Sequence, residues 1–361
     1  MRSHADEVSL AQAYTRSMPF EGLGEEQRAF VRERGQELYR WFRNHQGAHR
    51  LISTGVIAFL FVSDFFILMR LPGALLGAGG DVTTGRLLLA SLVTAVLHGW
   101  VLYSLTIYSL HEGVAHEMIF PPRGRVTRIL GKVSNNLCRL SGADPVEYGR
   151  SHRDHHSRFG TIDDGEFVSF VHPRRFWRVL LPFAMFLNHS DFVAHRGLTY
   201  SRSRLASELL TVGAHGVAGY FMAQRFGVAF PILTLALLAP HVAFQLDRLR
   251  QFSEHNLMPV ESKDGARSFG PGFWGLFVGG GPWGQPCHWI HHLIPSIPWY
   301  QQIMLHREVT AILSPRQRTQ YLLTRGAGYP RLLWRLWTEP RAFARSRASS
   351  GQHLPAPEGQ R

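Results

Sequence analysis

The chain has 361 residues, of which 45% are hydrophobic, and its 39 Lys and Arg against 26 Asp and Glu give a net charge of +13. The sequence contains no helix-turn-helix, zinc-finger or aromatic RNA-binding signature, so we expect no nucleic-acid partner despite the charge. A basic face beside an anionic membrane leaflet gives the same charge a direct electrostatic role. The two cysteines, Cys138 and Cys287, are too few for a disulfide scaffold or an iron–sulfur centre and fit a reducing cytoplasm.

The N-terminal 50 residues are polar and charged. They lack the apolar core of a cleavable signal peptide, so we interpret residues 1–50 as a cytoplasmic arm. Within this arm, alternating charges over residues 25–42 predict one helix.

Four apolar stretches follow, and each is a candidate membrane helix. Residues 51–69 and 87–110 are each long enough to cross a hydrocarbon layer of about 30 Å at roughly 1.5 Å per residue. Residues 208–224 form a shorter and weaker stretch, followed after a three-residue gap by the strongly apolar residues 228–246. The predicted fold is therefore all-α, with four transmembrane helices in two hairpins. A buried hairpin of a soluble protein is the alternative, and it is strongest for residues 208–224.

The distribution of basic residues predicts the orientation in the membrane. Of the 39 Lys and Arg residues, only Arg70, Arg86 and Arg225 fall in the two short loops between the paired stretches. The positive-inside rule then places both termini in the cytoplasm, and we expect the cell inner membrane.

The predicted domain organisation follows from this topology. The polar segments between and after the hairpins form a helical cytoplasmic cap. We expect a catalytic domain over residues 51–310 and a C-terminal cytoplasmic segment over 311–361. This segment becomes rich in Ser, Pro and Gln and is predicted to be disordered after about residue 340.

Histidines cluster beside the predicted spans in four places. HEGVAH (residues 111–116) begins where the second span ends, and His255 lies about 12 Å beyond the fourth span if that helix continues. HRDHH (152–156) and HWIHH (288–292) each place histidines at i, i+3 and i+4, which puts three rings on one face of a helix. The topology thus brings nine imidazoles to one side of the membrane.

Nine neutral nitrogen donors indicate two metal ions. A single tetrahedral zinc takes three or four ligands, whereas two ions sharing nine would have four or five each and keep a position open. Imidazole suits iron, zinc, copper and nickel, so the donor type alone does not name the metal. A zinc-protease HExxH site is excluded because the second histidine of HEGVAH is at i+5, and the paired Glu-x-x-His motifs of soluble di-iron bundles are absent.

The order HEGVAH, HRDHH, HWIHH resembles the three histidine boxes of the membrane fatty acid desaturase and hydroxylase superfamily. The patch at residues 253–256 and the Pro-rich tail of the third box at 293–300 support the resemblance, which spans about residues 50–310. It implies two Fe²⁺ ions, with O₂ as co-substrate, and a ligand set made of His111, His116, His152, His155, His156, His255, His288, His291 and His292.

The resemblance also draws attention to three side chains near the predicted ligands. In acyl-CoA desaturases an Asn four residues before the extra histidine reaches iron through water, but here that position is Gln251, which puts the contact in doubt. The acidic loop at residues 160–164 resembles the segment after the second box. Its Asp163 and Asp164 are candidates for orienting the rings, although a solvated acidic loop explains them equally well.

The resemblance implies an O₂-dependent desaturase that introduces a double bond into the acyl chain of a lipid or thioester. The alternative is a di-iron hydroxylase or ketolase of a lipid, carotenoid, sterol or alkane. A more distant alternative is a non-enzymatic membrane metal-binding protein. The chain has no cytochrome b5 heme motif and no dinucleotide fingerprint, so we expect an external ferredoxin- or cytochrome-type electron donor with a reductase.

The remaining histidines are interpreted structurally. His98, His215 and His241 lie inside predicted spans, where we expect them to make helix-packing hydrogen bonds. His306 is predicted to be structural, and the roles of His189 and His195 stay open.

Overall fold

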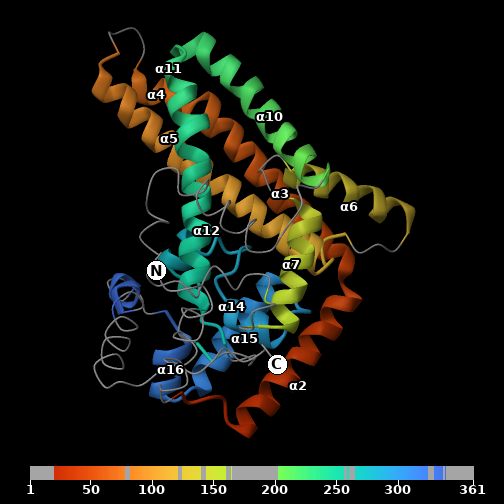
Figure 1. Cartoon of the computed structure of the whole chain (residues 1–361). Helices are drawn as coiled ribbons and strands as arrows, with labels where there is room; N and C mark the ends of the chain where they lie inside the picture. The colour runs from red at the N-terminus through yellow and green to blue at the C-terminus, as the bar shows by residue number, and fades with distance from the viewer. Residues whose placement is uncertain are drawn as a thin grey trace, which may run out of the picture. The chain divides into compact units, whose positions relative to one another are not determined.

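The computed structural model is helical throughout the part of the chain that it describes (Figure 1). It describes residues 20–77, 82–120, 124–139, 144–159, 164, 202–255, 258–259, 265–323, 329–335 and 338. The predicted all-α class is confirmed for these residues, where an isolated parallel bridge between Ser268 and Leu322 is the sole β-type pairing. The predicted disordered tail and Asp163 lie outside them.

The chain divides into two compact units. The histidine unit comprises Met1–Asn44, Arg150–Leu181 and Arg248–Arg361, and the membrane unit comprises His45–Gly149 and Pro182–Asp247. Two boundaries between the units fall inside helices, namely α7 (Pro145–Ser157) and α12 (Ala239–His255).

Three helical segments are long and apolar enough to cross a membrane, which indicates a membrane protein. They are Gln46–Leu76, Thr84–Ala115 and Ala229–His255. The first consists of α3 (Gln46–Met69) and α4 (Leu71–Leu76), the second of α5 (Thr84–Thr106) and the π-helix η1 (Ile107–Ala115), and the third of α11 (Ala229–Pro231), the π-helix η4 (Ile232–Leu238) and α12. The predicted spans 51–69 and 87–110 lie within the first two, and the predicted span 228–246 begins one residue before the third and otherwise lies within it.

The predicted span 208–224 lies within α10 (Arg202–Phe226), which is not among the three candidates. The reason is compositional. Glu208, His215 and several glycines interrupt its apolar residues and lower its mean hydropathy. A fourth span, and the topology that depends on it, stay predictions.

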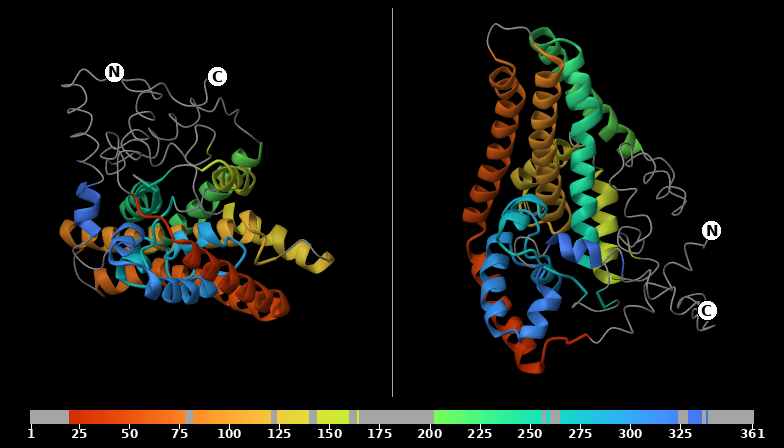
Figure 2. Two further views of the ribbon diagram at one scale, coloured as in Figure 1. Left: turned by 90° about the horizontal axis from the view of Figure 1, so that it is seen from below. Right: turned by 90° about the vertical axis from the view of Figure 1, so that its left-hand side faces the viewer.

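Close packing joins the helices of the membrane unit. Figure 2 shows α3, α5 and the α11–α12 segment running alongside one another. Gly99 on α5 permits the approach, because a Cβ there would lie 2.6 Å from the Ala239 carbonyl oxygen and 2.9 Å from the Val242 Cβ. An apolar core of Leu68, Met222, Phe230 and Leu235 packs α10, α11 and η4 against the end of α3.

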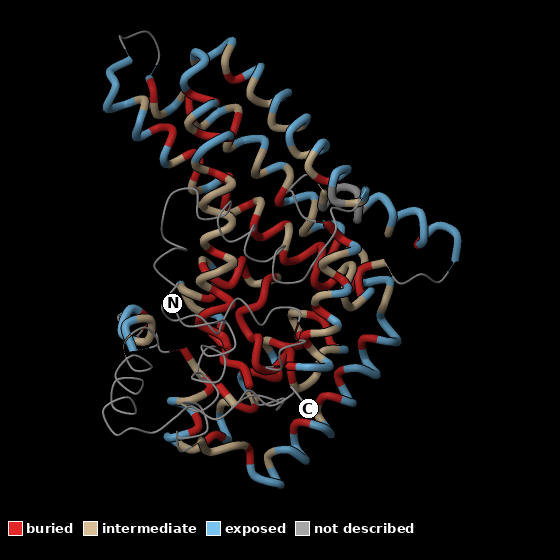
Figure 3. The backbone as a smooth tube through the Cα atoms, in the orientation of Figure 1, coloured by how far each residue is buried: buried red, intermediate tan, exposed pale blue. Residues whose placement is uncertain are grey.

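Large apolar side chains cover the outside of the membrane unit. On α3, Phe59, Phe65 and Phe66 are each more than half exposed, and the exposed stretches are visible in pale blue in Figure 3. Exposing many large apolar side chains is unfavourable in water, whereas contact with lipid tails accommodates them. α6 (Arg125–Cys138) in the same unit also exposes Val126, Ile129 and Val133.

The helices of the histidine unit pack around a buried apolar core that includes Trp289, Ile290 and Leu305. The elements of the unit are α2 (Glu25–Asn44), α13 (Phe273–Phe277), α14 (His288–Leu293), α15 (Trp299–Ile312) and α16 (Pro315–Tyr321), together with parts of α7 and α12. Helix α2 confirms the helix predicted for residues 25–42. Gly35 on α2 lets Ile294 pack against the helix backbone, since a Cβ at Gly35 would lie 2.9 Å from the Ile294 side chain.

Candidate metal centre

Helix α7 positions the second histidine box. The Asp144 carboxylate accepts a hydrogen bond from the Val146 amide (2.9 Å), and Pro145 is the first helical residue, so the sequence specifies where the helix begins. Two turns later, His152, His155 and His156 lie on one side of the helix, and the His152 and His156 ring centroids are 4.6 Å apart.

Helix α14 positions the third box, and its opposite face is anchored in the core. The Trp289 indole stacks on the Tyr321 ring with centroids 4.0 Å apart, and the Trp289 amide donates to the Ser268 hydroxyl (3.1 Å). Trp289 and Ile290 are fully buried. With these two residues fixed in the core, His288, His291 and His292 have little freedom to turn away.

His255 is the last residue of α12, so the helix continues past the predicted span 228–246, which is the condition on which the expected position of His255 depended. The Met258 amide donates to the His255 carbonyl oxygen (3.1 Å), which closes the helix end. The His255 ring is buried and joins those of α7 and α14.

Four of these rings form a chain of facing Nε2 atoms. The His155 Nε2 lies 3.3 Å from that of His292, which lies 3.0 Å from that of His288, which in turn lies 2.8 Å from that of His255. Two nitrogens bound at right angles to one ion, each at about 2.1 Å, are roughly 3 Å apart. The four nitrogens therefore have the mutual spacing of ligands around a single metal ion.

A second group in the histidine unit has the same spacing. The His156 Nε2 lies 3.0 Å from the His152 Nε2 and 2.9 Å from the His291 Nε2. The His156 ring is also 4.8 Å, centroid to centroid, from the His292 ring of the first group. The two groups are thus neighbours, as expected of a pair of adjacent ions.

The hydrogen bonds at the far ring nitrogens show that these sites fit a cation. The Nδ1 of His255 faces the Gly265 carbonyl oxygen (3.2 Å), and the Nδ1 of His155 faces the Asp164 carboxylate (3.0 Å). Both partners accept hydrogen bonds, so in the neutral rings the proton lies on Nδ1 and the lone pair on Nε2. The His288 Nδ1, 3.2 Å from Gln285 Oε1, follows the same pattern. Lone pairs that converge in this way repel one another unless a cation lies between them.

Burial keeps the rings in the neutral form that a metal requires. Desolvation, followed by the neighbouring His292, lowers the pKa of His288 well below its usual value near 6.5. Desolvation, followed by His156, does the same for the pKa of His292. Imidazole binds a metal only when the coordinating nitrogen is deprotonated, so the apolar surroundings favour metal binding.

The first histidine box lies in the membrane unit, on the π-helix η1. The His116 amide donates to the His111 carbonyl oxygen (3.1 Å), which is the i to i+5 bond of a π-helix. This geometry brings the rings of His111 and His116 to 4.7 Å, centroid to centroid. The five-residue spacing, which does not suit the zinc-protease pattern, therefore matches the local helix type.

The three side chains that the resemblance placed near the ligands have different surroundings. Asp164 is buried and contacts His155, whereas Gln251 accepts a hydrogen bond from Arg248 (3.1 Å). Asp163 lies outside the described residues.

The sequence reasoning did not assign roles to Glu254 and Gln285. The buried Glu254 carboxylate pairs with Arg250 (2.6 Å) and lies 3.7 Å from the His288 Nε2. The sequence did offer a sign of each. Glu254 is an acidic residue directly before His255, and Gln285 is an amide three residues before His288.

Comparison with protein-family models identifies the chain. The model described as fatty acid desaturase matches residues 86–324, about two thirds of the sequence. The chain belongs to the fatty acid desaturase family. Comparison with curated proteins gave no match, and comparison with solved structures gave none either.

Membership of the fatty acid desaturase family makes this protein an oxidoreductase, and the family typically uses two irons. The histidine groups provide donors of the kind that such a centre needs. The matched segment begins in α5 and ends shortly after α16, so it contains all three histidine boxes.

Proposed function

We propose that the protein is an O₂-dependent di-iron fatty acid desaturase, which introduces a double bond into the acyl chain of a lipid or an acyl thioester. The observation that carries the proposal is the pair of adjacent histidine groups in the histidine unit, with facing nitrogens 2.8–3.3 Å apart. Family membership supports the reaction class.

We further propose that all nine predicted histidines hold the two irons. The first ion would take its ligands from His155, His255, His288 and His292. The second would take His152, His156 and His291, completed by His111 and His116 of the membrane unit. The π-helical pairing of these last two rings supports their action as one bidentate unit.

Two ferrous ions held by these histidines would supply, with O₂, the oxidising power for removing hydrogen from an unactivated C–H bond. The residues of the chain would have two tasks around them. Asp164, Gln285 and the Gly265 carbonyl hold the Nδ1 protons, and so direct each Nε2 lone pair inward. The Phe159 ring packs 5.2 Å from His155 and 5.4 Å from His292 and helps to exclude water.

The proposal includes a topology and an electron source. We place both termini and the metal centre in the cytoplasm of a cell whose inner membrane holds the spans. The acyl substrate then reaches the centre from the bilayer. An external ferredoxin- or cytochrome-type donor with its reductase delivers electrons to the basic cytoplasmic side.

Lipid profiling of cells with and without the gene tests the reaction. We expect new acyl chains that are lighter by two hydrogens when the gene is present and O₂ is supplied. Products that are heavier by one oxygen would contradict desaturation and indicate hydroxylation.

Ligand variants test the assignment of the centre to the reaction. His155→Ala and His291→Ala, one from each group, should both abolish the product and lower bound iron while membrane insertion is retained. His45→Ala, at an exposed histidine outside both groups, is the matched control. Full activity in either ligand variant would refute the assignment.

A further inference from the structure

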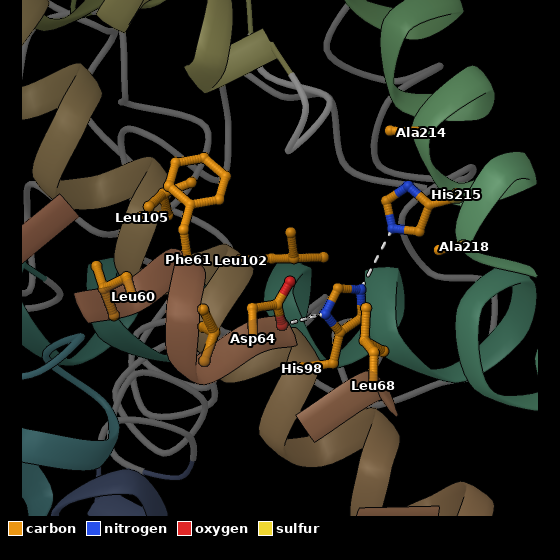
Figure 4. Close-up of a pocket in the computed structure, with 11 residues that line it drawn as sticks. Leu60, Phe61, Asp64, Leu68, His98, Leu102, Leu105, Ala214, His215 and Ala218 are labelled. Atoms are coloured by element: carbon orange, nitrogen blue, oxygen red, sulfur yellow. Dashed lines mark hydrogen bonds and ion pairs between the residues drawn. The ribbon is translucent and has the colours of Figure 1, made fainter. Parts of the chain in front are cut away.

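A polar cluster lies inside the membrane unit, apart from the histidine boxes. The Asp64 Oδ1 is 2.6 Å from the His98 Nδ1, and the His98 Nε2 is 3.4 Å from the His215 Nε2. Figure 4 shows the three side chains converging from α3, α5 and α10. The predicted helix-packing role is thus confirmed for His98 and His215, whereas Asp64 was not singled out from the sequence.

Placing this cluster inside a membrane costs free energy, because ionisable groups lose their contact with water there. Asp64 and His98 both lie near the middle of a candidate span, where an ionisable side chain needs a partner or a function. His98 is almost fully buried, and the carboxylate of Asp64 is mostly buried.

Hydrogen-bond bookkeeping determines the charge of the cluster. The His215 Nδ1 donates to the Thr211 carbonyl oxygen (2.8 Å), so its Nε2 must accept from His98. The His98 Nε2 therefore carries a proton, and a further proton lies between its Nδ1 and Asp64. Whichever of the two holds that proton, the cluster has a net charge of zero, which makes it tolerable in lipid.

One oxygen of Asp64 has no donor among the residues that the structure describes. The carboxylate uses Oδ1 for His98, and its other oxygen points away from that ring (Figure 4). Beside it lies a cavity of about 120 Å³. Asp64, His98 and His215 contribute to its wall, and the rest of the lining is apolar, with side chains such as Phe61 and Leu68. An acceptor facing an apolar cavity calls for a ligand with one hydrogen-bond donor on an apolar body.

We propose that this cavity binds the hydroxyl end of an apolar alcohol or phenol from the bilayer, with the hydroxyl donating to Asp64. The cavity volume limits the group that enters. A cavity of roughly 150 Å³ is known to accept a benzene ring, so about 120 Å³ suits a single ring or a short alkyl segment. Two membrane sources share this chemistry, namely a quinol headgroup and an alkanol. The proposal is independent of the desaturase function, because it concerns binding alone.

Binding of a matched ligand pair tests the proposal. The full-length protein in lipid nanodiscs is titrated with 4-methylphenol and with 4-methylanisole, which replaces the donor hydroxyl by a methyl ether, and empty nanodiscs are subtracted. A hydrogen bond to a carboxylate contributes enough that we expect the phenol to bind about tenfold more tightly. Equal affinities for the two compounds would overturn the proposal.

Two variants localise the binding. Asp64→Leu, which removes both acceptor oxygens, should remove the preference for the phenol, and Leu102→Trp should fill the cavity and reduce binding of both compounds. Ser91→Ala, a buried polar residue on α5 outside the cavity, is the control and should bind like the wild type. If Asp64→Leu does not fold, Leu102→Trp decides, and unchanged binding in that variant overturns the proposal.

Competition identifies the source of the ligand. Displacement of 4-methylphenol by duroquinol assigns the site to a quinol, and displacement by octanol alone assigns it to an alkanol. Displacement by neither compound contradicts the proposed site.

Discussion

Adjacent histidines in the second and third boxes belong to different groups of ring nitrogens. His155 and His292 face the first group, whereas their chain neighbours His156 and His291 face the second. Successive residues on a helix point about 100° apart. A pair of neighbouring histidines can therefore serve two neighbouring ions, which explains why both boxes end in two histidines.

The Asp164 contact leads to a prediction about metal affinity. Asp164→Ala should weaken iron binding about 10- to 100-fold, because the His155 ring loses the carboxylate that fixes its tautomer and orientation. Asp164→Asn keeps an acceptor oxygen and should restore part of the affinity. Titration with ferrous iron under anaerobic conditions measures both.

The control for this change is Asp154→Ala, on the same helix as His155. Its carbonyl accepts from the Arg158 amide, a bond that the substitution preserves. An Asp164→Ala protein that binds iron as tightly as the Asp154→Ala protein would show that the carboxylate does not support the ligand.

His306 gives a pH-dependent prediction. Burial, reinforced by Arg307, lowers the pKa of His306 from 6.5 to about 4. Between pH 6.5 and pH 4, His306 binds a proton in the unfolded chain but not in the folded chain. The free energy of unfolding therefore falls as the pH falls through this window. The loss attributable to His306 is about 3 kcal/mol at its largest.

His306→Gln should reduce this acid sensitivity. Thermal unfolding of the detergent-solubilised protein from pH 7 to pH 4 measures it, with His45→Gln, an exposed histidine, as the control. If His306→Gln and His45→Gln lose stability in parallel, the burial of His306 is not responsible.

At the residue scale, the sequence predicted much of the candidate site. The spacing of the boxes predicted which rings share a helix face, and α7 and α14 have that geometry. It did not predict the acceptors at Gly265 and Gln285, because both depend on how the loop after α12 folds back. That path is set by tertiary contacts such as the bond from the Arg267 amide to the Glu254 carbonyl oxygen, which leave no periodic signal.

Among the helices, the contact at Gly99 predicts a specific packing defect. Gly99→Ala should destabilise the membrane unit by about 1–3 kcal/mol, because the added Cβ would overlap the Ala239 carbonyl oxygen and the Val242 side chain. Thermal stability in detergent, followed by size-exclusion chromatography, measures the change.

Gly213 on α10 is the matched control, because a Cβ there meets no atom within 4 Å. Gly213→Ala should be neutral or slightly stabilising, since alanine favours the helix. Equal stability of the two alanine variants would show that α5 does not depend on the close approach.

Helix existence was easier to predict than helix type. Apolar runs predicted the three candidate spans, because burial in lipid requires uninterrupted hydrophobic length. The π-helices η1 and η4 were not predicted. Hydropathy is insensitive to whether a backbone bond skips four residues or five, although the i+5 spacing of His111 and His116 was a usable sign.

For the whole molecule, the charge distribution predicts how electrons arrive. Because 36 of the 39 Lys and Arg residues fall outside the two short loops, an acidic donor protein should dock by electrostatic attraction. Raising the ionic strength from about 0.05 M to 0.5 M should slow turnover, since screening shortens the range of that attraction. Turnover with a small neutral reductant should change little, and salt-independent turnover with the protein donor would contradict the docking.

The central claim is that two adjacent groups of histidines hold two irons. Iron per chain, measured after anaerobic reconstitution with Fe²⁺ and removal of loosely bound metal, tests it most directly. We predict two irons in the wild type, with fewer in His292→Ala and His156→Ala, which each lose a ligand from a different group. A wild-type protein that saturates at one iron, or binds none, would contradict the account.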